Sequence, residues 1–156
     1  MSIPLANSPA DVVRYLLIAL GLGTLPTNTP QGNWPISSGQ ELNDPDNTVT
    51  VYDTLGNKHA RIMIDGQVVE DPGIQIRVRA TDNPTAQTQA EIIKQAIDER
   101  ATGYNVQIPD LSNVLHNFTV YALNRSGNPI QLGKESPTSN RRIYTINATV
   151  TLRQAT

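Results

Sequence analysis

The sequence contains no cysteine, few charged residues and few aromatic ones. Without cysteine, a disulfide or a thiolate metal site is impossible. Charged residues make up 17% and aromatic residues 4% of the 156 residues, so we expect an Ile, Leu and Val core beneath a polar, nearly neutral surface. The net charge of −2 lacks the basic footprint that nucleic-acid binding requires. The composition therefore argues against a protein that grips DNA.

Long apolar runs are also missing. The most apolar run, residues 12–22, is too short to cross a bilayer and is interrupted by Arg14. The first four residues show no signal-peptide pattern, so we expect a protein made in a reducing cytoplasm and without contact to a membrane. A length of 156 residues predicts a single domain, 1–156.

Two segments carry the start signals of helices. Ser8 can cap a helix whose first position is Pro9, and apolar residues then recur at helical spacing as far as Leu20. Asn83-Pro84 repeats this signal, and Gly103 is the predicted stop of the second helix.

Short segments of alternating apolar and polar residues predict strands. They are residues 48–54, 60–64, 74–80, 115–123, 130–132 and 142–152, with turns at Gly56-Asn57 and Asp65-Gly66. The order is helix, three to four strands, helix, three strands. This order favours an α+β fold, a mainly antiparallel sheet with both helices packed on one face. A long Pro- and Asn-rich loop is expected at about 24–46, interrupted by a short strand near Trp34.

The sequence offers no convincing catalytic, cofactor or metal site. His59 and His116 have no partner at metal-ligand spacing. Asp110 and Ser112 lie near His116, but the serine has no nucleophile elbow, so a catalytic triad is disfavoured. We expect a protein that is not an enzyme and that binds no cofactor or metal.

One strand carries a polar face that admits two interpretations. Gln75, Arg77 and Arg79 alternate with the apolar residues of strand 74–80. The polar side chains either form a solvated face or contact another subunit, where arginine is enriched. In the second case the acidic residues Asp44 and Asp46, or Glu70 and Asp71, of the next copy are the candidate partners.

Several segments, taken in order, resemble one known family. They are Trp34-Pro35-Ile36, residues 44–54 with the ending Val51-Tyr52-Asp53-Thr54, residues 73–79, the helix near 86–101 and the last hairpin. From about residue 12 to residue 152 the chain resembles the bacteriophage minor capsid and tail terminator family. Segments 21–40 and 61–69 depart from the family pattern.

The resemblance implies a structural protein of the virion neck. Members of this family share the fold of the tail tube subunit and form a hexameric ring that caps the finished tube and ends its polymerisation. The ring connects the tail to head-completion proteins, and DNA passes through its centre without sequence-specific binding. The implied partners are thus further copies of the chain, the tail tube protein and neck proteins. Candidate contacts with tube or head are the loops 24–40, with Trp34, and 134–140, with Lys134 and Glu135.

Three other functions remain as alternatives. The chain could be another ring or tail protein of the neck, such as a head-closure ring or the tube subunit itself. A different class is a small-ligand-binding α+β domain. A small hydrolase ranks last, because no credible catalytic group is present.

Overall fold

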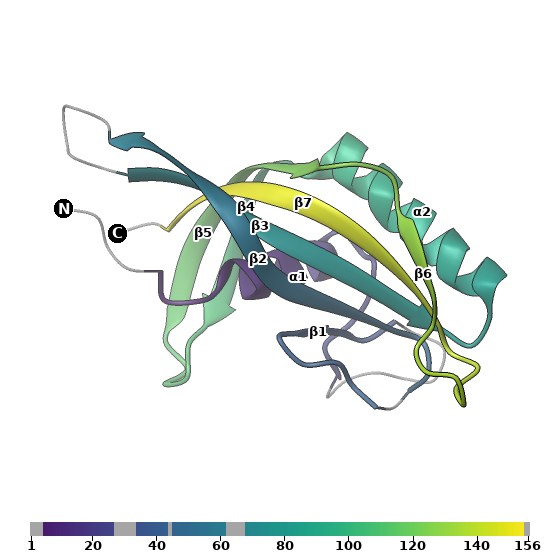
Figure 1. The fold of residues 1–156 in the computed structure, drawn as a ribbon. Helices are drawn as coiled ribbons and strands as arrows, with labels where there is room; N and C mark the ends of the chain where they lie inside the picture. The colour runs from purple at the N-terminus through teal and green to yellow at the C-terminus, as the bar shows by residue number, and fades with distance from the viewer. Residues whose placement is uncertain (1–4, 27–33, 44, 62–67, 155–156) are drawn as a thin grey trace.

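The computed structural model describes residues 5–26, 34–43, 45–61 and 68–154. These residues form two helices and seven strands in an α+β arrangement, as predicted (Figure 1). The elements are α1 (Pro9–Ala19), β1 (Ile36–Ser38), β2 (Thr48–Arg61), β3 (Val68–Ala80), α2 (Asn83–Arg100), β4 (Thr102–Pro109), β5 (Leu115–Arg125), β6 (Ile130–Lys134) and β7 (Arg142–Gln154).

The strands form one mainly antiparallel sheet in the order β1-β2-β3-β7-β5-β4. Only β1 pairs in parallel, with β2. β7 lies beside β3 along one edge, while its other edge pairs with β6 in its first half and with β5 in its second half. β7, whose alternating sequence predicted a strand, is therefore paired along both of its edges.

Both helices begin at caps that the sequence encodes. The Ser8 hydroxyl accepts a hydrogen bond from the Asp11 amide at 3.2 Å, and Pro9 opens α1 as predicted. In α2 the cap is Asp82, whose carboxylate accepts from the Thr85 amide at 2.8 Å. The prediction that Asn83 caps this helix is wrong by one residue, because Asp82 has the extended backbone that a cap requires.

Both helices cover the same face of the sheet. Val13 and Leu16 of α1, Ile93 of α2, and Ile74 and Ile76 of β3 belong to one buried cluster. The core consists almost entirely of aliphatic side chains, with Phe118 as its only fully buried aromatic residue among those described. The opposite face of the sheet is polar.

The turn predicted at residues 56–57 is wrong. β2 does not turn at Gly56-Asn57 but continues to Arg61, pairing with β3 through shifts in register. Gly56 allows the backbones of β2 and β3 to approach closely, since a Cβ at this position would lie 2.2 Å from the Asp71 carbonyl oxygen. The predicted turn at Asp65-Gly66 and most of strand 60–64 lie outside the described residues.

β4 is a strand that the sequence analysis missed. It follows α2 after a single residue and pairs with β5 from Thr102 to Pro109. A signal was present, because Tyr104, Val106 and Ile108 alternate with Asn105 and Gln107, and these three apolar side chains pack on the core.

We expect Gly73→Ala to destabilise the protein, because its Cβ would lie 2.2 Å from the Leu55 carbonyl oxygen of the neighbouring strand. Overpacking of this kind costs roughly 1–3 kcal/mol in the free energy of unfolding. Gly127→Ala is the matched control, since a Cβ added there would meet nothing within 4 Å. Urea unfolding measures both, and equal stabilities would contradict this account of the β2–β3 contact.

Candidate functional site

The side chains of β3 alternate between the core and the polar face, as the sequence predicts. Gln75, Arg77 and Arg79 face away from the helices, opposite the buried Ile74 and Ile76. In the rows across the sheet, Arg77 pairs with Thr50 of β2 and Thr145 of β7, and Gln75 pairs with Tyr52 and Asn147. We define the polar face by its members Tyr52, Gln75, Arg77, Thr145 and Asn147.

Arg79 is buried within the subunit rather than exposed on the polar face. Only 2% of its side chain is accessible. Its guanidinium donates to the carbonyl oxygens of Pro45 at 2.9 Å, Asp46 at 3.1 Å and Asn43 at 3.2 Å. Two carboxylates complete its surroundings: Glu135 at 3.4 Å and Glu41 at 3.9 Å. Arg79 thus fastens the loop before β2 to the end of the sheet.

Arg141 forms a second connection between the same loops. It donates to the Asn43 carbonyl oxygen at 2.7 Å and pairs with Asp46 at 2.8 Å. Its guanidinium also lies 3.6 Å from Glu135 in the β6–β7 loop. Residues 41–43, 45–47 and 134–141 are therefore held as one unit, which we call the arginine-held loops. Asp44, one of the predicted interface residues, lies outside the described residues.

Asp46 and Glu135 consequently make contacts inside the subunit. Their side chains remain 49% and 29% accessible, so each keeps an outer edge open to a partner. The sequence suggested that Arg79 pairs with acidic residues of the same loop on the next copy. In the structure it bonds that loop in its own chain.

Arg77 is the more accessible of the two arginines on β3, at 30%. It lies 3.6 Å from Glu41 and stacks over the Tyr52 ring at 5.6 Å. Burial and the nearby Glu41 carboxylate raise the pKa of Tyr52. Gln75 donates to Asn147 at 3.2 Å across the same face.

Glu41 is the residue that the sequence analysis missed. It lies between Arg77 and Arg79, and one of its carboxylate oxygens is buried without a hydrogen-bond partner. A signal was present, because Glu41 is the only charged residue between residues 24 and 43. A single charge in such a loop indicates a specific partner, which here is the β3 arginine pair.

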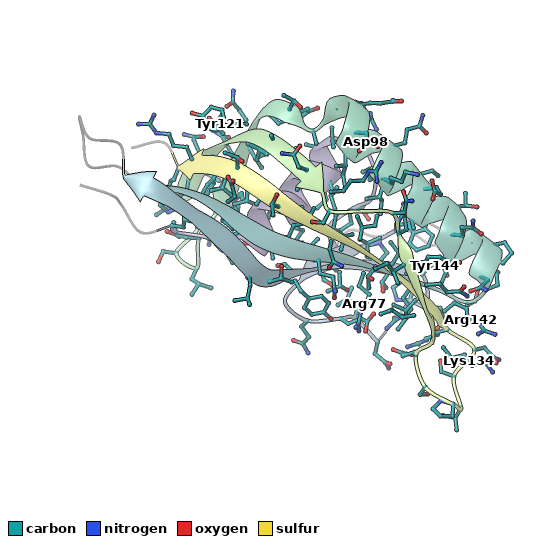
Figure 2. The ribbon with its side chains drawn as sticks, turned by 45° about the horizontal axis from the view of Figure 1, so that its top comes forward. Arg77, Asp98, Tyr121, Lys134, Arg142 and Tyr144 are labelled. Carbon is teal, nitrogen blue, oxygen red and sulfur yellow. The ribbon has the colours of Figure 1, made fainter. Side chains whose placement is uncertain are left out.

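Trp34 and Lys134 occupy different surroundings. Trp34 packs, partly buried, against the hydrophobic core, and its carbonyl oxygen accepts from the Thr24 amide at 2.9 Å. Lys134 is exposed at the end of β6, directly opposite Arg142 of β7. Figure 2 shows Lys134 and Arg142 at the same end of the molecule.

The His116 region is a structured turn. His116 Nε2 lies 2.8 Å from one Asp110 carboxylate oxygen, while the backbone amide of Ser112 donates to the other at 2.8 Å. The hydrogen bond with His116, together with those from the Val114 and Ser112 amides, lowers the pKa of Asp110. The carboxylate thus organises a chain reversal. In the described part of the chain, no group of three or more His, Cys, Asp or Glu residues is placed to hold a metal ion.

A family model described as bacteriophage tail terminator protein matches residues 16–154. The chain belongs to the bacteriophage tail terminator family. This confirms the resemblance seen in the sequence, and it makes the chain a structural protein of a phage tail. No curated protein matches the chain. Of the helices in the described ranges, none has the length and apolar character needed to cross a membrane.

For this tail terminator, we expect Arg79→Ala to lower the free energy of unfolding by about 3–5 kcal/mol, because it removes three hydrogen bonds from a buried cation to loop carbonyls and the pairing of that cation with Glu41 and Glu135. Arg77→Ala is the matched control on the same strand. Its side chain is 30% exposed, so its loss is expected to cost less than about 1 kcal/mol. Chemical unfolding of the two variants measures the difference. A small, equal loss for both would show that the arginine-held loops are not fixed through Arg79.

Proposed function

We propose that this tail terminator acts, as one domain, in a hexameric ring that caps the tail tube at the neck. The ring ends polymerisation of the tube and offers its upper surface to head-completion proteins, while DNA passes through the centre. The family match carries the proposal, because it covers nearly the whole fold, from α1 through β7. The weakly acidic composition supports it, since a conduit that bound phosphates tightly would retain the DNA.

The fixed loops at one end of the sheet favour a role in contacting partners. Loops joined by Arg79 and Arg141 already have a defined shape in the free subunit. A surface that is ordered beforehand loses less conformational entropy on binding than a flexible one. We assign contact with the tube or the head proteins to the outer edges of Asp46, Lys134 and Glu135. Trp34 supports the neighbouring segment through its packing on the core.

The polar face is our candidate for contact between neighbouring subunits. Gln75 and Arg77 are only partly buried, and Gln75 lies beside the exposed Asn147, whose amide is able to donate and accept hydrogen bonds. A ring requires a heterologous contact, in which two different patches of each subunit meet. The polar face supplies one of the two patches.

Deletion of the gene separates the candidate functions, and electron microscopy of the resulting particles is the measurement. For a terminator, we expect tails of uncontrolled length without attached heads, and expression of the wild-type chain from a plasmid should restore normal virions. Absence of any tail would indicate the tube subunit, and detached tails of normal length would indicate a head-closure ring. Joined virions with tails of normal length would reject a role in the neck and favour a regulatory, ligand-binding domain.

A further inference from the structure

The turn between β4 and β5 exposes an uncharged apolar surface. Leu111 is 106% exposed, and Val114 and Leu115 are 54% and 58% exposed. These three residues, which we call the apolar turn, lie at the tip of the β4–β5 hairpin. Figure 1 shows this hairpin tip at the opposite end of the molecule from β6. Exposed apolar side chains that gather in one place indicate an interaction site.

The apolar turn is held in shape by hydrogen bonds at its base. One Asp110 carboxylate oxygen accepts from the amides of Ser112 at 2.8 Å and Val114 at 3.0 Å. The Asp110 amide donates to the Val114 carbonyl oxygen at 2.9 Å, and His116 holds the second carboxylate oxygen. Asn113 adopts a φ of 61°, which asparagine tolerates in tight turns. The three apolar side chains are therefore presented at a small entropic cost.

A second exposed apolar pair lies on β6, at the rim of the polar face. Ile130 and Leu132, which we call the β6 rim, are each 52% exposed. Ile130 pairs with Thr145 of β7, which in turn pairs with Arg77 of β3. Two strand spacings of about 4.8 Å separate Ile130 from Arg77, so the β6 rim and the polar face are continuous.

Next to the β6 rim lie two positive charges without an acidic partner among the described residues. Lys134 and Arg142 stand opposite each other across β6 and β7, and neither forms an ion pair within the described ranges. Like charges in this position destabilise a free sheet, and an approaching carboxylate relieves the repulsion. At the other end, Asp110 lies at the base of the apolar turn, and Asp53 accepts from the Ala10 amide at the start of α1 at 2.9 Å. Arg153 of β7 is an exposed cation at that end of the sheet.

We propose that the apolar turn of one subunit docks on the β6 rim of the next copy of this chain. Each subunit then contributes one turn and one rim, which is the pair of different patches that a closed ring requires. Docking covers Leu111, Val114 and Leu115 with Ile130 and Leu132, and it brings Asp110 of one subunit towards Lys134 and Arg142 of its neighbour. This inference rests on the proposed ring and names the contact that closes it.

Disulfide trapping tests the contact, because the natural chain has no cysteine. The double variant Leu111→Cys, Ile130→Cys is oxidised with diamide, alone and with purified tail tubes, and separated on a non-reducing gel. We expect a ladder of covalent multimers that ends at the size of the ring. Mixing the two single variants should stop at a dimer, since each has only one half of the contact. Leu111→Cys with Ile92→Cys is the matched control, because Ile92 is 45% exposed but lies on α2.

The outcomes separate this inference from the proposed function. If wild-type rings are visible by microscopy but the Leu111–Ile130 pair crosslinks no better than the control pair, the ring stands and the inference is overturned. If wild-type protein with tail tubes forms no ring, the proposed function itself fails. If Leu111→Asp leaves the ring intact but abolishes co-sedimentation with tail tubes, the apolar turn binds the tube, and the second-copy proposal is wrong.

Discussion

The burial of the Arg79 guanidinium is the constraint on which one end of this molecule depends. A cation taken out of water is stable only where hydrogen bonds and opposite charges replace its hydration. Arg79 receives three backbone carbonyls and two carboxylates, and all of these come from loops rather than from the sheet. The requirement of one side chain therefore fixes the path of two loops that are distant in sequence.

The two faces of the sheet differ in composition and in the role that each plays. The face towards the helices is aliphatic and supplies the stability of the fold through burial. The opposite face carries polar side chains, and at the end held by Arg79 its threonines at 48, 50 and 145 are themselves buried. A subunit of an assembly benefits from this division, because substitutions on its contact surfaces leave the core unchanged.

Local signals predicted the elements well, whereas the contacts of the polar residues could not be predicted. The Ser8-Pro9 start of α1 and the alternation in β7 depend on neighbours in sequence, and both are confirmed. Alternation also assigns Arg77 and Arg79 to one face, but it does not distinguish their burial, which differs between 30% and 2%. That difference arises from the loop carbonyls of Asn43, Pro45 and Asp46 and from Glu135, which contact Arg79 and are remote from it in the chain. The turn predicted at Gly56 was wrong for the same reason, since a glycine that allows two strands to approach closely looks like a turn residue in the sequence.

The placement of charge along the molecule bears on how identical subunits associate. An arginine whose donors are already engaged, such as Arg79, has little left to offer a neighbour, so the loop it binds contributes shape rather than free charge. Lys134 and Arg142 differ, because no acidic residue in the described chain neutralises them. Asp110 and Asp53 lie at the other end, so the two ends differ in the charges that they offer to a partner. In the proposed contact, Lys134 and Arg142 of one subunit meet carboxylates of the next, whereas a two-fold contact through β6 would bring like charges together.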